Sequence, residues 1–166
     1  PFIVMEVMEG GSLRDRINSL KKVGIGEASG LIEGVLSGLA AVHARGVIHR
    51  DIKPANVLLD GAGQPRLTDF GIAQARQTTD FQTRTGAVMG TLAYMSPEQR
   101  ESAARVSPAA DLYAVGAMLF ALLSKRHPYD LYVAEKQDLA FQDFSPDLQV
   151  FLSKACAFLP ENRFAN

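Results

Sequence analysis

The hydrophobic residues of this chain recur mostly at the three- and four-residue spacing of a helix. This spacing extends from Leu13 to Leu20, from Glu27 to Ala44 and from Pro146 to Phe158. A further segment, Pro108 to Leu123, is apolar at nearly every position, which is typical of a helix buried on all sides. The pattern therefore predicts a domain in which helices dominate.

Shorter apolar runs, rich in branched residues, predict a small strand component. Phe2 to Val7 has the composition of a buried strand. Val57 to Leu59 and Arg66 to Thr68 flank a turn that opens with Asp60-Gly61, as in a hairpin. With these strands added to the helices, the predicted fold class is mainly α, of the α+β type.

Three glycines share one face of the helix predicted for Glu27 to Ala44. Gly30, Gly34 and Gly38 stand four residues apart, and each costs about 1 kcal/mol of helix stability relative to alanine. One interpretation is that they permit close packing of another element. The other is that a well-buried helix tolerates them. Gly46, just after this segment, is the expected C-cap.

Composition and charge narrow the classes of protein. The chain has 166 residues, enough for one domain with its own core, and a net charge of −1. We therefore expect no binding to nucleic acid through bulk charge. The lone Cys156 cannot form an internal disulfide, which fits a reducing compartment and a buried structural thiol. The longest strongly apolar run, Ala114 to Leu123, is shorter than the roughly 20 residues of a membrane helix, so we expect no membrane contact by this segment.

Residues suited to catalysis concentrate between Val47 and Gly71. Asp51, Lys53 and Asn56 lie within one short stretch, and Asp69 follows the second strand of the predicted hairpin. Phosphoryl transfer needs a carboxylate to accept a hydroxyl proton, oxygen ligands for Mg²⁺ and a cation near the transferred group. These residue types indicate a site for metal-bound phosphate and a hydroxyl nucleophile.

The same stretch resembles the catalytic and metal-binding loops of eukaryotic-like (Hanks-type) protein kinases. Further kinase motifs follow in order, and their wording is most similar to bacterial serine/threonine kinases. The segments that carry the resemblance are H-R-D-I-K-P-A-N (His49 to Asn56), D-F-G (Asp69 to Gly71), G-T-L-A-Y-M-S-P-E (Gly90 to Glu98), D-L-Y-A-V-G (Asp111 to Gly116) and P-E-N-R (Pro160 to Arg163). The opening I-V-M-E-V-M-E-G-G-S-L resembles the hinge that binds adenine.

The resemblance implies a role for each matching residue of the central loops, with ATP and Mg²⁺ as cofactors and Mn²⁺ as an alternative metal. Asp51 would be the catalytic base that orients the substrate hydroxyl, and Lys53 would contact the transferred phosphate. Asn56 and Asp69 would ligate the metal. The position of Lys53 two residues after Asp51 is the serine/threonine pattern of the family rather than the tyrosine pattern.

The resemblance also implies an adenine site near the start of the chain. Glu6 and Met8 would offer backbone groups to the base, and Met5 would gate the pocket behind it. Leu58 would pack beneath the base. The expected partners are therefore ATP and proteins that carry a reactive serine or threonine.

In the family, an arginine placed like Arg50 pairs with a phosphothreonine of the activation loop. Thr83 and Thr85 stand where bacterial relatives are phosphorylated, and autophosphorylation there would involve self-association. The alternative is that threonines simply populate the polar loop from Ala73 to Gly86. Thr91, in the closing loop, would be a contact on the substrate side.

The histidines of the chain are expected to be structural. The resemblance places the ring of His49 against Phe70 as a packing residue. His43 is expected to be a core histidine with satisfied hydrogen bonds, and His127 is expected at the surface. No spacing of histidine and cysteine resembles a zinc site.

Three other motif residues would support the C-terminal part of the fold. Asp111 would begin the central helix, and Arg163 would pair with Glu98 of the closing loop.

The stretch from Lys125 to Asp147 is shorter than is usual in the family. That length weakens the case for a substrate-docking helix there.

We expect residues 1–166 to be a partial protein kinase domain. Residues 1–11 would be the hinge strand and linker, residues 12–166 the C-terminal lobe, and residues 69–98 approximately the activation segment. The Gly-rich loop and strand lysine of an N-terminal β lobe have no counterpart, so we expect little activity from this chain alone. The parent protein is expected to be cytoplasmic or anchored in a membrane through other segments.

The predicted function of the parent protein is transfer of the ATP γ-phosphate to serine and threonine hydroxyls of proteins. The alternative is a noncatalytic kinase-like scaffold or a truncated remnant of a kinase. The presence of Asp51, Lys53, Asn56 and Asp69 together favours the enzyme, because a noncatalytic relative need not keep all of them.

Overall fold

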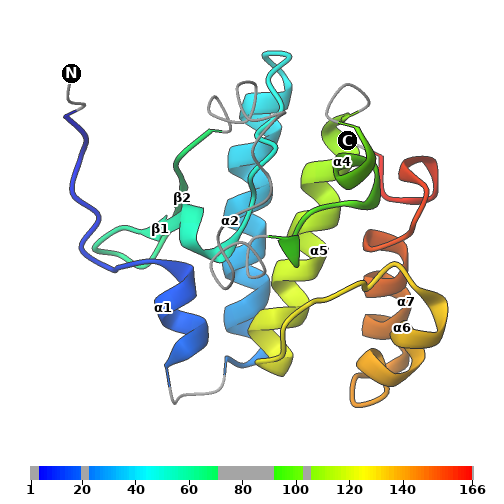
Figure 1. Cartoon of the computed structure of the whole chain (residues 1–166). Coiled ribbons are helices and arrows are strands. Elements are labelled where there is room, and N and C mark those ends of the chain that lie inside the picture. The colour runs from blue at the N-terminus through cyan, green and yellow to red at the C-terminus, as the bar shows by residue number, and fades with distance from the viewer. Residues whose placement is uncertain (1–3, 20–22, 71–91, 103–105, 166) are drawn as a thin grey trace, which may run out of the picture.

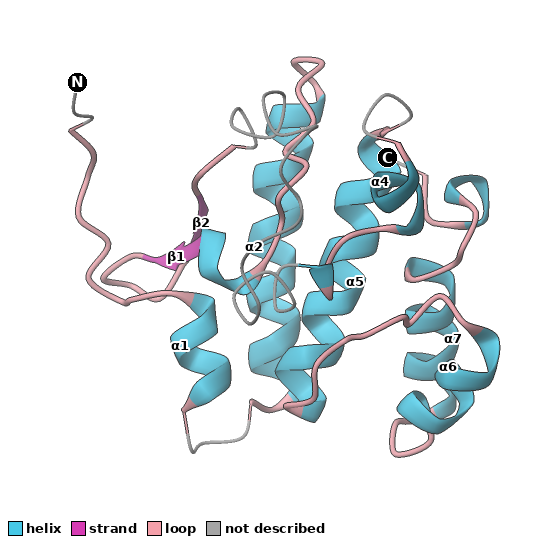
Figure 2. Ribbon diagram, in the orientation of Figure 1, coloured by secondary structure: helices cyan, strands magenta, loops and turns pink. Residues whose placement is uncertain are grey.

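The computed structural model describes residues 4–19, 23–70, 92–102 and 106–165. Within these residues the chain is mainly helical and has one two-stranded antiparallel sheet (Figures 1 and 2), so the expected mainly α class is confirmed. In chain order the elements are α1 (Leu13–Asn18), α2 (Ile25–His43), the 3₁₀ helix η1 (Pro54–Asn56), β1 (Val57–Leu59), β2 (Pro65–Leu67), α4 (Pro97–Glu101), α5 (Pro108–Ser124), α6 (Ala134–Phe141), α7 (Pro146–Ala155) and the 3₁₀ helix η4 (Pro160–Asn162).

Helices α2 and α5 lie side by side at the centre of the molecule, and α7 packs on α5 from the other side (Figure 1). Residues 113–122 of α5 are all buried, as its continuous apolar sequence predicts. A Cβ atom at Gly116 would lie 2.7 Å from Cβ of Ala155, so α7 approaches the backbone of α5 closely. Cys156 is fully buried at this contact, and burial raises its pKa to about 12. The thiol is therefore structural.

Helix α2 has 19 residues, and by length and composition alone it is long and apolar enough to cross a membrane. Core helices of globular domains often meet the same criteria. The buried residues of α2, which include Leu31, Val35 and Leu39, belong to the hydrophobic core that α5 shares. One face of α2 therefore packs into the core, and 28% of its apolar window is buried.

The structure distinguishes among the three glycines of α2. A Cβ atom at Gly34 would lie 2.4 Å from Cγ of Pro65, and one at Gly38 would lie 3.2 Å from Cδ1 of Leu67. No atom lies within 4 Å of the corresponding position at Gly30. Close packing against β2 therefore explains Gly34 and Gly38, and it does not explain Gly30.

Replacing Gly34 with alanine is expected to lower the free energy of unfolding by about 1–3 kcal/mol, the usual cost of an overpacked contact. The methyl group would meet the rigid ring of Pro65, which cannot move away by changing rotamer. Gly30→Ala is the matched control: it adds the same group to the same helix in open space and should stabilise by up to about 1 kcal/mol. Chemical denaturation measures both, and equal stabilities would contradict the packing interpretation.

Two glycines attach the N-terminal segment to the hairpin. The Gly10 N–H donates to the Leu59 carbonyl at 2.9 Å, and the Leu59 N–H donates to the Gly11 carbonyl at 2.8 Å. Ser12 then caps α1, because its hydroxyl oxygen accepts the Asp15 N–H at 3.2 Å while its own N–H and hydroxyl donate to the Asp15 carboxylate at 2.9 and 2.6 Å. The hydrogen bonds from Ser12 hold the pKa of Asp15 below its ordinary value.

The predicted hairpin is confirmed, with the second strand beginning one residue earlier than expected. Its register pairs Val57 with Leu67 and Leu59 with Pro65. The turn is closed by Asp60, whose Oδ1 accepts hydrogen bonds from two amides of the turn at 2.9 and 3.0 Å. The second strand ends at Leu67, so the hairpin leads directly into the loop that contains Asp69.

The buried strand predicted for Phe2 to Val7 is wrong for the part of that segment that the structure describes. Residues 4–8 form no strand, and Val4 and Val7 are 86% and 82% exposed. A strand needs a neighbouring strand to take up its backbone hydrogen bonds, and no described segment lies beside residues 4–8 in that way. Branched residues favour an extended backbone, but they do not supply a partner.

The stretch from Lys125 to Asp147, whose short length weakened the case for a helix, does contain one, α6. Phe141 at its end is buried, and its ring centroid lies 5.7 Å from that of Phe120 in α5. The other predicted helices are confirmed with shifted ends: α2 begins at Ile25, and α7 ends at Ala155. Gly46 follows α2 at a left-handed φ of 71°, so it turns the chain after the helix.

Candidate active site

Asp51, Lys53 and Asn56 lie together in the loop of residues 49–56, called the HRD loop below. Lys53 Nζ donates to both carboxylate oxygens of Asp51, at 3.0 and 2.8 Å. Asn56 Nδ2 donates to Oδ2 and to the backbone carbonyl of Asp51, both at 2.8 Å. The Asp51 side chain is 20% exposed, so it is held in one place and is still reachable from solvent.

The local sequence explains this arrangement. Pro54 begins the 3₁₀ helix η1, where its fixed φ suits the first helical position and its missing N–H is not needed. The Asn56 N–H donates to the Lys53 carbonyl at 2.9 Å, which closes the turn. The turn brings the buried Asn56 back to Asp51. The geometry of these residues therefore depends on a short stretch of chain.

Asp111, in the first turn of α5, anchors the HRD loop from the core. Its Oδ2 accepts the His49 N–H at 2.9 Å and lies 2.8 Å from Nε2 of His43, and its Oδ1 accepts the Arg50 N–H at 2.8 Å. The Asp111 and His43 side chains are each 1% exposed. These bonds keep a carboxylate inside the protein with its oxygens satisfied. His43 is therefore a core histidine, as predicted.

His49 connects the HRD loop to the loop that carries Asp69. Its Nε2 lies 3.0 Å from the carbonyl oxygen of Thr68, and its ring centroid lies 4.7 Å from that of Phe70. The His49 side chain is fully buried. This environment suits a packing residue that aligns the two loops.

Asn56 and Asp69 have the chemistry to hold a divalent metal together with phosphate. The Thr68 N–H donates to the Asn56 carbonyl at 3.0 Å, so Asp69 follows directly after a residue bonded to the HRD loop. Asp69 is exposed and has a left-handed φ of 55°. The Asn56 side chain bonds Asp51 through Nδ2, and its Oδ1 accepts no hydrogen bond from another described residue.

One carboxylate and one amide oxygen suit Mg²⁺, which takes few protein ligands and completes its shell with phosphate oxygens and water. In the described part of the chain, no group of three or more His, Cys, Asp and Glu side chains is arranged to hold a metal.

The predicted adenine-binding residues are only partly brought together. Leu58 lies half-buried on β1, where it forms an isolated antiparallel β-bridge with Ser12. Met5 and Glu6 are exposed, and no hydrogen bond from another described residue reaches the backbone of Met5, Glu6 or Met8. Their backbone groups are thus unpaired within the described residues, and the adenine site remains a prediction.

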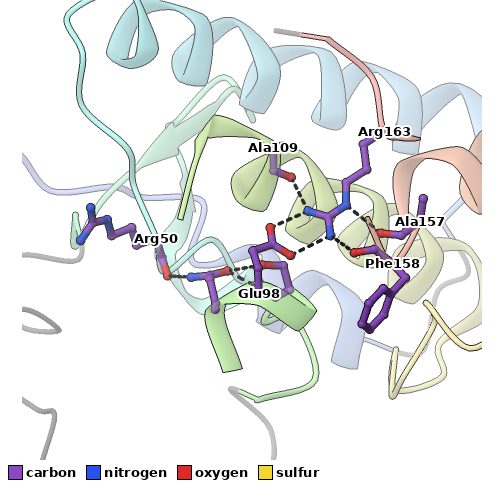
Figure 3. A network of polar contacts seen from close by, with 8 residues as sticks. Arg50, Glu98, Ala109, Ala157, Phe158 and Arg163 are labelled. Atoms are coloured by element: carbon purple, nitrogen blue, oxygen red, sulfur yellow. Dashed lines mark hydrogen bonds and ion pairs between the residues drawn. The ribbon is translucent and has the colours of Figure 1, made fainter. Parts of the chain in front are cut away.

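The predicted regulatory loop lies outside the described residues, as do Thr83, Thr85, Thr91 and Gly71. Arg50 is described. Its guanidinium makes no hydrogen bond or ion pair with another described residue, and its side chain points away from the neighbouring polar network (Figure 3). The pairing of Arg50 with a phosphothreonine remains a prediction.

Glu98 and Arg163 form a bidentate ion pair that fixes α4 to the end of the chain (Figure 3). The two guanidinium–carboxylate distances are 2.7 and 2.8 Å, and the Arg163 side chain is fully buried. Arg163 also donates to the carbonyls of Ala109, Ala157 and Phe158. Burial favours a higher pKa for Glu98, but the hydrogen bonds and charge of Arg163 outweigh it, so the pKa lies below its ordinary value.

The Glu98–Arg163 pair should make the stability of the domain depend on acid. Because the folded pKa of Glu98 is lowered, the pair stabilises fully above the unfolded pKa of about 4.3 and loses its effect as pH falls through the folded pKa. Wild type is therefore expected to lose more stability than Glu98→Gln below about pH 5. Melting temperatures measured across pH test this.

Glu101→Gln is the control for that comparison, since it removes an exposed carboxylate from the same helix. Its acid dependence should follow wild type. Parallel curves for wild type and Glu98→Gln would show that the ion pair does not contribute to the acid dependence.

Gln99 is a site residue that the sequence analysis missed. Its Nε2 donates to the Arg50 carbonyl at 2.8 Å, and its Oε1 accepts from the Ser96 hydroxyl at 3.1 Å. The S-x-x-Q spacing of Ser96 and Gln99 was the available signal, because it is typical of a capping box. That signal predicts the contact with Ser96, but it does not predict the contact with Arg50.

A shallow recess lies between the HRD loop and the segment that precedes α4. It is lined by both sides, including Arg50, Asp51 and Ile52 from the loop and Tyr94 and Met95 from the segment. Asp51 therefore borders a hollow of about 10 Å³, which is room for about one water molecule.

The fold and the loops agree with the comparison to known families. The sequence profile described as "Protein kinase domain" matches residues 1–165. The chain belongs to the protein kinase domain family.

Among individual proteins, the chain is similar to bacterial serine/threonine-protein kinases, which confirms the predicted Hanks-type, bacterial resemblance. It is 39% identical to serine/threonine-protein kinase PknL of Mycobacterium tuberculosis over 129 residues, 78% of this chain and 32% of that protein. It is 40% identical to serine/threonine-protein kinase PrkC of Bacillus subtilis over 129 residues, 78% and 20% of the two chains. It is 42% identical to a probable serine/threonine-protein kinase, PknB, of Lactococcus lactis over 130 residues, again 78% and 20%. The chain thus spans between a fifth and a third of the length of these relatives.

Proposed function

We propose that the full-length protein containing this chain transfers the γ-phosphate of ATP to serine and threonine hydroxyls of proteins. The observation that carries the proposal is the Asp51 carboxylate, which Lys53 and Asn56 hold in one place while 20% of it stays exposed to solvent. No feature of residues 4–19, 23–70, 92–102 and 106–165 favours the alternative of a noncatalytic scaffold.

Asp51 would orient the substrate hydroxyl and accept its proton as the oxygen bonds to the γ-phosphorus and ADP leaves. Lys53, whose Nζ lies 2.8 Å from Asp51, is near enough to stabilise negative charge on the transferred group. Asn56 Oδ1 and Asp69 would hold Mg²⁺, or Mn²⁺ in its place. The metal would neutralise the charge of the phosphate oxygens.

Nucleotide binding would also use the beginning of the chain. The backbone groups of Glu6 and Met8, which pair with no other described residue, would bind the adenine edge, with Met5 next to the pocket and Leu58 beneath the ring. The Gly10 and Gly11 bonds to Leu59 support this arrangement, because they attach the segment to the strand that carries Leu58.

Regulation would act through Arg50. Its guanidinium would pair with a phosphate on Thr83 or Thr85, added by a second copy of the protein, and Thr91 would contact the substrate. The lack of a partner for this guanidinium among the described residues supports the proposal. Because ATP is the donor, the catalytic segment would lie in the cytoplasm, whether or not other segments anchor the protein in a membrane.

The proposal is tested by incubating the purified full-length protein with ATP labelled on the γ-phosphate, Mg²⁺ and a general protein substrate. Label is expected on serine and threonine, and removal of divalent metal with EDTA should abolish it because Asn56 and Asp69 then lack the ion that holds the phosphates. Added Mg²⁺ or Mn²⁺ should restore it. Labelling that survives EDTA, or label on tyrosine alone, would contradict the proposal.

A further inference from the structure

The backbone of Arg50, next to Asp51, has a conformation that needs support. Its φ is 66°, in the left-handed region, and such a conformation costs a non-glycine residue about 1–2 kcal/mol. It persists only where surrounding contacts hold it. The orientation of the Arg50 peptide also sets where the chain enters Asp51.

Both polar groups of the Arg50 backbone are held by side chains from distant parts of the chain. Asp111 accepts the Arg50 N–H at 2.8 Å. Gln99 Nε2 donates to the Arg50 carbonyl at 2.8 Å, and Figure 3 draws this bond at the Arg50 carbonyl oxygen. Asp111 lies 61 residues away in sequence and Gln99 lies 49 residues away. Asp111 comes from the rigid core helix α5, whereas Gln99 comes from the short helix α4.

The Gln99 carboxamide can point only one way in this network. Its Oε1 lies 3.3 Å from the Ser96 N–H and 3.1 Å from the Ser96 hydroxyl, and the N–H can only donate. The Arg50 carbonyl can only accept, so it requires the amide nitrogen. Ser96 is fully buried, which protects these bonds from competition by water.

A helix cap alone does not require glutamine at this position. Glutamate serves equally at the fourth position of a capping box, because its oxygen also accepts from the serine. Glutamate cannot donate to the Arg50 carbonyl, and two oxygens would then face each other. The contact with Arg50 therefore requires the amide nitrogen of glutamine, whereas the cap requires only an acceptor oxygen.

We propose that Gln99 is a positioning residue for Asp51, which couples the segment before α4 to the HRD loop through the Arg50 carbonyl. This inference rests on the proposed phosphoryl-transfer function. When Gln99 withdraws, Arg50 keeps only its bond to Asp111, and the carboxylate of Asp51 loses its fixed orientation towards the substrate hydroxyl. Misplacement of a reacting group by about 1 Å can cost 10²-fold in rate.

The test compares Gln99→Glu with wild type in the full-length protein. Because glutamate preserves the cap, the variant should still fold, with a melting temperature below wild type by no more than the loss of one hydrogen bond explains. We expect its kcat to fall by about 10- to 100-fold while KM for ATP stays the same, since Gln99 is placed against the HRD loop and not at the nucleotide. A wild-type kcat in Gln99→Glu would overturn the inference.

Gln149→Glu is the matched control. Gln149 also donates through Nε2 to a backbone carbonyl at 2.8 Å, that of Phe144, but it does so on α7. Loss of an equivalent bond there should leave kcat unchanged. An equal loss of kcat in both variants would mean that the effect is a general loss of structure, and it would also overturn the inference.

Amide hydrogen exchange separates this inference from the proposed function. Gln99→Glu should speed exchange in a peptide that covers residues 49–52, and Gln149→Glu should not. If the wild-type protein transfers no phosphate to serine or threonine, the proposed function fails, and exchange still shows whether Gln99 holds the loop. Unchanged exchange in residues 49–52 of Gln99→Glu would overturn the positioning role.

Discussion

Replacing Asp51 with asparagine is expected to slow phosphoryl transfer by the full-length protein by about 10²–10⁴-fold, the usual contribution of a positioned base. Asparagine has nearly the same shape as aspartate, but it cannot accept the hydroxyl proton. It also removes the negative partner of Lys53, whose Nζ lies 2.8 and 3.0 Å from the carboxylate oxygens. Steady-state kinetics should show a lower kcat with little change in KM for ATP.

Asp60→Asn is the control for this substitution. Asp60 is a carboxylate of the hairpin turn, paired with Arg66 at 2.9 Å and without contact to the HRD loop. The control should retain the wild-type rate. If Asp51→Asn also retains that rate, Asp51 is not the base and the mechanism proposed for this site is wrong.

The second large effect concerns stability. Replacing Asp111 with alanine is expected to lower the free energy of unfolding by about 3–5 kcal/mol, as when one partner of a buried charge pair is removed. The N–H groups of His49 and Arg50 and the ring of His43 would lose their common acceptor in a site that water does not reach. Buried donors without a partner are costly. Chemical denaturation measures the loss, and Asp111→Asn provides a second variant with the same shape.

Asp147→Asn separates hydrogen bonding from the helix dipole. Asp147 is also an acidic residue in the first turn of a helix, α7, but its side chain is exposed. The dipole contribution of such a residue is about 0.3–1 kcal/mol. If Asp111→Ala cost no more than Asp147→Asn, the network around Asp111 would contribute little to stability.

The contacts within the HRD loop were accessible from the sequence because they are local. Asp51, Lys53 and Asn56 lie in one short turn, and Pro54 begins it. Helices α1, α2, α5 and α7 were equally accessible, since hydrophobic spacing and caps act over a few residues. The resemblance to kinase motifs then supplied roles that no spacing rule provides, and the family match agrees with it.

Contacts between distant residues were less accessible. The choice between the two interpretations of the α2 glycines depended on where Pro65 and Leu67 pack. The strand predicted near Val4 failed because β-propensity does not provide a neighbouring strand. Gln99 was missed because a capping-box signal describes only its own helix.

The sequence by itself determined the positions of α1, α2, α5 and α7, the hairpin and the chemical groups of the HRD loop, because each depends on residues close together in the chain. Only the tertiary structure decided how that loop is held. Asp111 and Gln99 reach Arg50 across 61 and 49 residues, and both contacts exist only because α4 and α5 pack around the loop. Such contacts depend on the folded arrangement of several elements, so the same side chains carry no signal of them in a linear sequence.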